Sequence, residues 1–178
     1  MKHSNNIKKI FYDVVIVILI SKENNLFRLI QDIQSYAKSK YLIILYFDKT
    51  LDNETYKIAK ILHDKKKVIV KKDYKVKNLA DAYYRAYKFS CTFNANWILS
   101  MVAGYRHLPR DIPKFLYFKK RNYDCIWGFR TSSSNKASMY RRLVSYFGHI
   151  LSHYFLKLDL KDLTSGFFMI KKKFLKKS

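Results

Sequence analysis

Residues 14–20 read Val14-Val15-Ile16-Val17-Ile18-Leu19-Ile20, and every one of them is apolar. All but the leucine are β-branched, which favours an extended chain. A strand that lies in a parallel sheet between two layers of helices needs such a run, because both of its faces are buried. The run is too short to span a bilayer, and Ser21, Lys22 and Glu23 follow where a signal peptide would have a small-residue cleavage site. We therefore predict a buried strand, and neither a transmembrane helix nor a signal peptide.

Strand-like and helix-like segments alternate outward from this run. Further strands are predicted at Tyr41–Phe47, Val68–Val70, Trp97–Met101, Cys125–Gly128 and Phe167–Ile170. Helical spacing of apolar residues occurs at 26–33, at 58–62 behind a cap at Asn53, at 79–89, after Asp111, and at 139–156. This order is typical of an α/β domain with a mainly parallel sheet, right-handed crossovers and flanking helices. Ligands in such sheets bind beyond the carboxyl ends of the strands, so the candidate loops follow Ile20, Phe47, Met101 and Gly128.

The composition is unusual mainly in its charge. The 178 residues include 36 Lys and Arg against 13 Asp and Glu, which gives a formal net charge of +23. Such an excess favours an anionic partner, such as a nucleic acid, an anionic lipid or a phosphorylated substrate, although AT-rich codons alone would also raise the lysine content. No RNP, KH, helix-turn-helix or zinc-finger pattern accompanies the charge, so a nucleic acid is the less favoured partner.

The remaining composition bounds the organisation of the chain. Glycine and proline are scarce, with 4 and 2 residues, so no flexible linker is indicated. We expect a basic N-terminal tail at residues 1–12 and a single domain at 13–178. The 2 cysteines lack C-x-x-C spacing, which indicates a reducing, cytoplasmic location and gives no zinc site.

Four segments carry short motifs whose order and spacing are more informative than any one of them. Asp162-Leu163-Thr164-Ser165-Gly166-Phe167-Phe168 resembles the signature D-x-[TV]-S-G-F-[RF]. Asp111-Ile112-Pro113, preceded by Met101, His107 and Pro109, resembles M-D-A-D-L-Q-H-P-P-E-D-I-P. Gly128-Phe129-Arg130 resembles G-S-R, and Arg141-Arg142-Leu143-Val144-Ser145 after it resembles R-[RK]-L-x-S. Phe47-Asp48-Lys49-Thr50-Leu51-Asp52-Asn53-Glu54-Thr55 is similar to D-D-G-S-x-D-x-T.

Together these motifs resemble family 2 glycosyltransferases of the dolichyl-phosphate mannose synthase, or polyprenyl-phosphate glycosyltransferase, group. The resemblance implies a GT-A fold and transfer of a sugar from a nucleotide-diphosphate sugar to a polyprenyl (dolichyl) phosphate at the cytoplasmic face of the membrane. It further implies that Asp48 and Asp52 contact the nucleotide-sugar donor. Arg130, Arg141 and Ser145 are then expected to bind the acceptor phosphate. The residues alone leave simpler roles open, since Asp48 can cap a turn and Arg130 can form a surface salt bridge.

The departures from the family fall on the donor side. Members bind Mg²⁺ or Mn²⁺ through the two aspartates of a D-x-D motif, but the corresponding residues here are Val102 and Gly104, which have no side-chain oxygen. We therefore assign no metal ligand. The glutamine that follows in the family is Arg106 here, and Arg106 and Asp162 are the catalytic candidates, although Asp162 can also cap the turn after it. Because the chain ends at Ser178, we expect a C-terminally truncated domain.

Three interpretations follow from these departures. The chain is a degenerate relative that folds without catalysing, a transferase that uses Arg106 in place of a metal ion, or a non-catalytic basic module that binds anionic lipid or nucleic acid. The lysine-rich segment 171–177 agrees with peripheral contact at an anionic membrane surface, where each lysine contributes about 1 kcal/mol. Because both D-x-D aspartates are replaced, we favour the first interpretation on chemical grounds, and the other two stay open.

Overall fold

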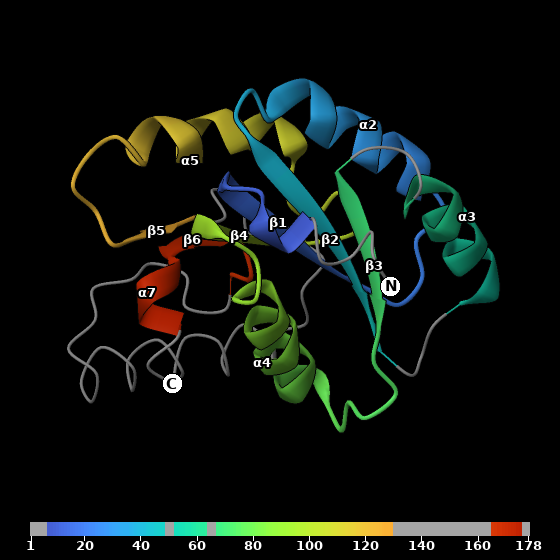
Figure 1. The fold of residues 1–178 in the computed structure, drawn as a ribbon. Coiled ribbons are helices and arrows are strands. Elements are labelled where there is room, and N and C mark those ends of the chain that lie inside the picture. The colour runs from blue at the N-terminus through green and yellow to red at the C-terminus, as the bar shows by residue number, and fades with distance from the viewer. Residues whose placement is uncertain (1–6, 49–51, 64–66, 130–164, 176–178) are drawn as a thin grey trace, which may run out of the picture.

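The computed structural model describes residues 7–48, 52–63, 67–129 and 165–175 (Figure 1). Over these ranges the chain forms a six-stranded sheet in the order β3-β2-β1-β4-β6-β5. The strands are β1 (Tyr12–Ile20), β2 (Tyr41–Phe47), β3 (Val68–Lys72), β4 (Ala95–Val102), β5 (Cys125–Trp127) and β6 (Phe168–Lys171). The helical elements are α2 (Leu26–Tyr36), α3 (Asn53–His63), α4 (Leu79–Ser90), the 3-10 helix η1 (Pro109–Asp111), α5 (Ile112–Phe118) and α7 (Lys172–Leu175).

The sheet is mainly parallel, as predicted. β1 to β4 run parallel, whereas β6 runs antiparallel to both of its neighbours, β4 and β5. At the end of β1, Ile20 pairs with Phe47 of β2 on one side, and Leu19 pairs with Val102 of β4 on the other. The sequence did not indicate the reversed direction of β6, because a hydrophobic pattern reports burial and not strand direction.

One predicted helix cap is wrong. The side chain of Asp52, rather than that of Asn53, caps α3, because its Oδ2 accepts hydrogen bonds from the Thr55 backbone N–H at 2.9 Å and from the Thr55 hydroxyl at 2.8 Å. Asn53 is already the first residue of the helix. The helix predicted at 139–156 lies outside the described residues, as do residues 1–6 of the expected tail. Ile7, the first described residue of that tail, packs against the core.

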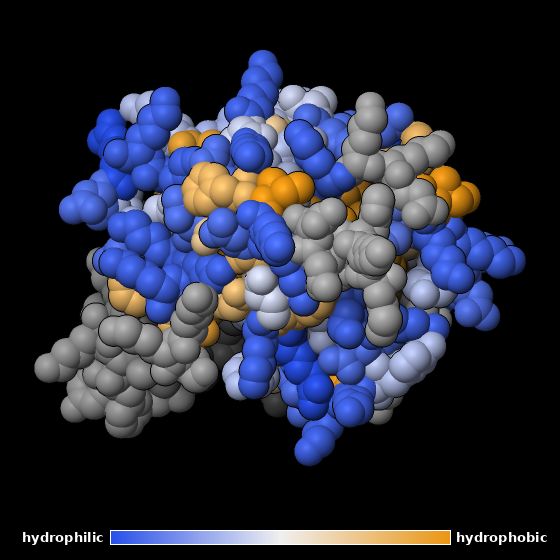
Figure 2. All heavy atoms as spheres, in the orientation of Figure 1, coloured by the Kyte–Doolittle hydropathy of each residue, from blue (hydrophilic) through white to orange (hydrophobic). Residues whose placement is uncertain are grey.

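The surface is mostly hydrophilic in the orientation of Figure 1 (Figure 2). Blue, hydrophilic side chains cover most of the described surface in this view, with a few orange patches between them. None of the described helices combines the length and the apolar composition that crossing a bilayer requires.

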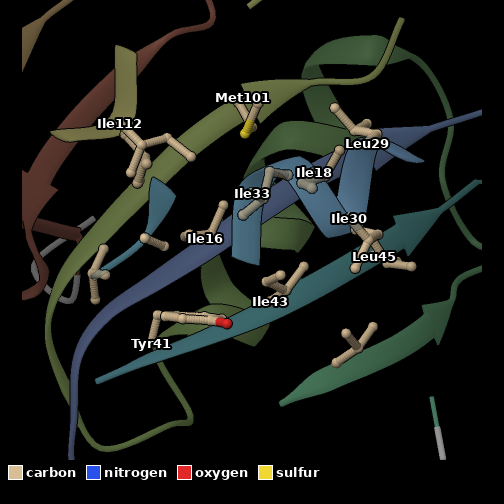
Figure 3. Close-up of a cluster of buried hydrophobic side chains, with 14 of the residues drawn as sticks. Ile16, Ile18, Leu29, Ile30, Ile33, Tyr41, Ile43, Leu45, Met101 and Ile112 are labelled. Atoms are coloured by element: carbon tan, nitrogen blue, oxygen red, sulfur yellow. The ribbon is translucent and has the colours of Figure 1, made fainter. Parts of the chain in front are cut away.

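Two layers of apolar side chains enclose the sheet, and β1 contributes to both. Ile16 and Ile18 pack on the side of α2, α3 and α5, as the close-up in Figure 3 shows, while Val15 and Val17 pack on the side of α4. All four side chains are completely buried. The uniform apolar run that the sequence shows therefore follows from the double cover, because neither face of β1 meets water.

Replacing Ile16 by alanine tests this double-layer packing. We expect Ile16→Ala to lower the free energy of unfolding by about 2–5 kcal/mol, because the substitution removes buried methyl groups and leaves a cavity in the centre of the core. Ile61→Ala is the control, since Ile61 on α3 is 55% exposed, and its effect should stay within about 0.5 kcal/mol. Urea denaturation of both variants measures the difference, and equal effects would contradict the packing described above.

Candidate functional site

A cavity of about 420 Å³ opens at the carboxyl edge of the parallel strands. It lies where the chain order reverses, since β2 and β3 extend the sheet on one side of β1 and β4 extends it on the other. Open α/β sheets bind their ligands at this switch point. The residues that line the cavity follow β1, β2 and β4 or belong to the start of α4: Leu19, Ile20, Ser21, Lys22, Tyr46, Asp48, Leu79, Ala82, Tyr83, Val102, Ala103, Gly104 and Arg106.

Three charged side chains line this cavity, each from a different strand end. Asp48 follows β2, Lys22 follows β1 and Arg106 follows β4. The structure therefore brings together two of the residues predicted from the sequence, Asp48 and Arg106. Within the part of the chain that the structure describes, no carboxylate forms a salt bridge with Arg106, whose side chain is exposed. A carboxylate with two cations in one cavity suits a ligand that carries both hydroxyl donors and a diphosphate.

The loop after β4 has an unusual backbone conformation directly before Arg106. Gly104 has a φ of 80° and Tyr105 a φ of 53°, so two successive residues adopt left-handed conformations. The loop closes on itself, because the Val102 backbone N–H donates to Nδ1 of His107 at 3.1 Å. A non-glycine residue in this region is strained and persists only where other contacts hold it, which is common at functional sites.

A side-chain hydrogen bond holds the strained Tyr105. Its hydroxyl donates to Oδ2 of Asp32 on α2 at 2.7 Å, which joins the loop to a helix 73 residues earlier in the chain. Burial and this hydrogen bond raise the pKa of Tyr105 to about 12. The Tyr105–Asp32 pair could not be predicted from the sequence, because the two residues lie far apart and belong to no motif.

Phe167 brings three of the sequence motifs together. His107 stacks on its ring with centroids 4.7 Å apart and planes 10° apart, and Phe115 lies 4.5 Å away on the same ring. The Gly128 backbone N–H donates to the Phe167 carbonyl at 2.8 Å. A Cβ on Gly128 would lie 2.9 Å from that carbonyl oxygen, which explains why glycine stands there. The motifs that include His107, Gly128 and Phe167 therefore form one packed unit beside the cavity.

The loop after β1 is fixed to the start of α3. The Glu23 backbone N–H donates to the Thr55 hydroxyl at 3.1 Å, and Oε1 of Glu23 accepts from the Asn25 N–H at 2.9 Å. The Asp52 backbone N–H donates to the Ser21 carbonyl at 3.1 Å. Glu23 is only 6% exposed, and sequence reasoning missed it. Its place directly after a strand at the switch point was the signal that could have identified it.

Asp52 lies outside the lining of the cavity, although it was predicted to contact the donor. Its carboxylate instead accepts hydrogen bonds from the backbone and hydroxyl of Thr55, which lower the pKa of that carboxyl below its usual range. The charge of Lys22, which does line the cavity, lowers it further. The contact between Asp52 and a nucleotide stays a prediction.

The described residues do not fit a divalent metal ion. At the D-x-D positions, Val102 and Gly104 supply no side-chain oxygen, and the nearest carboxylate to Gly104 is Glu23, whose Oε2 lies 3.6 Å from the place a Cβ on Gly104 would take. Across the described ranges, no three His, Cys, Asp or Glu side chains gather as metal ligands would. The other predicted site residues, Arg130, Arg141, Ser145 and Asp162, lie outside the described residues.

Comparison with known proteins supports the fold. No protein-family model matches the chain. A curated relative, the uncharacterized protein MJ0544 of Methanocaldococcus jannaschii, is 27% identical over 173 residues, which cover 92% of this chain and 73% of that protein.

Similar solved structures include glucosyl-3-phosphoglycerate synthase from Mycobacterium tuberculosis. Its complex with Mn²⁺, UDP-glucose and phosphoglyceric acid matches with a TM-score of 0.63 and 13% identity, and its complex with UDP matches with a TM-score of 0.60 and 11% identity. Each match covers 91% of this chain but 57% of the synthase chain. The fold of the chain is therefore the GT-A fold of nucleotide-sugar glycosyltransferases, as the sequence predicted.

Removing the Tyr105 hydroxyl tests its role in holding the loop. We expect Tyr105→Phe to lower the free energy of unfolding by about 1–2 kcal/mol near neutral pH, because the hydrogen bond to the Asp32 carboxylate is lost. The folded-state pKa of Tyr105 is raised, so the hydroxyl's contribution is fully present below the unfolded pKa of about 10. It is lost as the pH rises through about 12.

Urea denaturation of both proteins between neutral and alkaline pH checks this expectation. The stability difference between the wild type and Tyr105→Phe should shrink above about pH 10. Tyr123→Phe is the control, because Tyr123 is 49% exposed, and the hydroxyl of an exposed tyrosine should contribute within about 0.5 kcal/mol. A difference that does not change with pH would contradict a protonated hydroxyl donating to Asp32.

Proposed function

We propose that this protein binds a nucleotide-diphosphate sugar in the cavity and transfers the sugar to a polyprenyl phosphate, as the dolichyl-phosphate mannose synthase group of family 2 does. The observation that carries the proposal is the cavity itself, which lies at the switch point of a GT-A fold and joins Asp48, Lys22 and Arg106. The similarity of the fold to a synthase solved with UDP-glucose supports a nucleotide-sugar donor.

The negative and positive side chains of the cavity bind different parts of the donor. The Asp48 carboxylate accepts hydrogen bonds from the nucleoside, and Lys22 and Arg106 neutralise the diphosphate. In the reaction, an acceptor phosphate oxygen forms a bond to the anomeric carbon of the sugar. The bond from that carbon to the donor diphosphate breaks, and the nucleoside diphosphate leaves with the electron pair. Because the attacking phosphate is already an anion, the site needs no strong protein base.

The acceptor side rests on the motif resemblance. Arg130, Arg141 and Ser145 are proposed to bind the acceptor phosphate, and Asp162 to order the Thr-Ser-Gly turn or assist catalysis. Arg130 follows the Gly128–Phe129 segment, and Gly128 contacts Phe167, which supports an acceptor site beside the donor cavity.

Arg106 takes the place of the metal ion in this proposal. A guanidinium offers up to five N–H donors in a fixed plane, so it can neutralise a diphosphate and hold its orientation at the same time. The supporting observation is that Arg106 lines the cavity two residues beyond Gly104, where family members have an aspartate. The loss of both D-x-D aspartates also favours a second candidate function, a non-catalytic protein that binds the nucleotide or an anionic lipid.

A thermal-shift titration tests the donor site. We expect UDP-glucose, GDP-mannose or their nucleoside diphosphates to stabilise the protein without Mg²⁺ or Mn²⁺, by about 2.7 kcal/mol at a ligand concentration 100 times the dissociation constant. Arg106→Ala should weaken diphosphate binding by roughly 10- to 100-fold, because a charge-assisted hydrogen bond contributes about 1.5–3 kcal/mol. Arg110→Ala is a matched control, since Arg110 is an exposed arginine on η1 and does not line the cavity.

The outcomes separate the interpretations. A shift that requires a divalent metal would contradict the role of Arg106 as its replacement. The absence of a shift with every nucleotide would reject the donor site. Nucleotide binding without sugar transfer to a polyprenyl phosphate would select the non-catalytic candidate.

A further inference from the structure

We propose that the connection between β3 and α4, at the mouth of the cavity, is a membrane-contact surface that binds an anionic lipid bilayer. This contact surface consists of Lys72, Tyr74, Lys75, Lys77 and Leu79. The inference rests on the proposed function, because it explains how the protein would reach a lipid acceptor. Its evidence does not involve Asp48, Lys22 or Arg106, the charged residues of the donor cavity. Figure 1 shows the connection at the lower edge of the view, between the end of β3 and the start of α4.

Two large apolar side chains project from this surface into solvent. Tyr74 and Leu79 are each 67% exposed, the largest exposed fractions among the large hydrophobic residues of the described chain. Val76 between them is 4% exposed and packs into the core beside α4, so it anchors the segment while the residues on both sides of it are exposed. Leu79 also lines the cavity. An exposed aliphatic and an exposed aromatic residue beside a ligand cavity are typical of a surface that inserts into the headgroup region of a bilayer.

The contact surface also carries a net positive charge, because its three lysines outnumber the one negative charge that Asp73, Asp81 and Arg85 leave beside it. Asp73 accepts from the Tyr46 hydroxyl at 2.6 Å and lies 3.6 Å from Arg85. Asp81 forms a 2.9 Å salt bridge with the same arginine. Within the described ranges, no carboxylate pairs with Lys72, Lys75 or Lys77. The lysines are therefore the charges that this surface presents, and they complement an anionic headgroup layer.

Hydrogen bonds from backbone N–H groups hold the loop, and none of them uses a lysine side chain. The Lys75 backbone N–H donates to Oδ1 of Asp73 at 2.9 Å, and the Lys77 backbone N–H donates to Oδ2 of Asp81 at 2.9 Å. The Asp81 N–H in turn donates to Oδ1 of Asn78 at 2.9 Å, which caps α4. Because the backbone groups form these bonds, the Lys75 and Lys77 side chains can be replaced without releasing the loop.

A second basic and aromatic region provides a matched control at the other end of the sheet. This region lies at the end of α5 and consists of Tyr117, Lys120 and Arg121, of which Tyr117 is 56% exposed. It is close to the start of β1, because Nζ of the neighbouring Lys119 lies 3.9 Å from Oδ1 of Asp13. The cavity lies at the opposite end of β1. If net charge alone drove binding to vesicles, the two regions would contribute equally. If the contact surface binds the bilayer, its lysines contribute more than Lys120 and Arg121.

Vesicle sedimentation of the full chain tests the proposal. With vesicles of phosphatidylcholine mixed with phosphatidylglycerol, we expect Lys75→Gln/Lys77→Gln to lower the partition coefficient by about 25-fold, since each lysine contributes roughly fivefold. Lys120→Gln/Arg121→Gln removes the same charge and should change it less than about twofold. Vesicles of phosphatidylcholine alone should bind the wild type weakly.

Fluorescence reports the depth of the contact. A tryptophan introduced as Tyr74→Trp should shift its emission to the blue when anionic vesicles are added, and one introduced as Tyr117→Trp should not. Equal losses in the two charge variants, equal binding to neutral vesicles, or binding to RNA without binding to vesicles would each overturn the proposal. Nucleotide thermal shifts on the same variants separate it from the donor site: a nucleotide shift without vesicle binding rejects only the membrane contact, and vesicle binding without a nucleotide shift rejects only the donor site.

Discussion

The burial of β1 on both faces is the constraint on which the rest of the structure depends. Because Val15 and Val17 face one apolar layer and Ile16 and Ile18 face the other, none of these central positions of the strand can carry a polar group without leaving it unsatisfied. Chemistry is therefore confined to the residues beyond Ile20. β2 is likewise buried throughout, and the burial of both strands gathers the polar residues of the site at one edge of the sheet.

At that edge, backbone strain is balanced by packing. The left-handed Tyr105 is strained and would relax in an isolated loop, yet the loop is held from two sides. The Tyr105 hydroxyl reaches Asp32 on α2, and His107 stacks on Phe167 next to β6. These contacts fix the backbone on both sides of Arg106. The loop whose sequence resembles a metal-binding motif thus presents a cation, Arg106, at the cavity through its own contacts.

Much of the fold followed from the sequence, because burial leaves a periodic signal. The β1 run and the α2 spacing identified their elements directly, and Asp48 and Arg106 could be placed because residues after parallel strands must share an edge. The direction of β6, the Tyr105–Asp32 pair and the buried Glu23 could not be predicted. Each depends on which distant segments meet, and that information lies in tertiary packing rather than in local pattern.

The distribution of charge matters more than its sum. A net charge of +23 would suit any polyanion, and on its own it does not separate a nucleotide, a membrane or a nucleic acid. The structure shows where the positive charge is concentrated, because the acidic residues near the cavity form local ion pairs and hydrogen bonds. Arg85 forms salt bridges with Asp73 and Asp81, and the Thr55 backbone N–H donates a hydrogen bond to the Asp52 carboxylate. The cations left at this edge are Lys22 and Arg106 in the cavity and the lysines beside its mouth. This arrangement places cations for a soluble anionic donor and cations for a surface-bound anionic acceptor at one edge of the sheet, as the two proposals require.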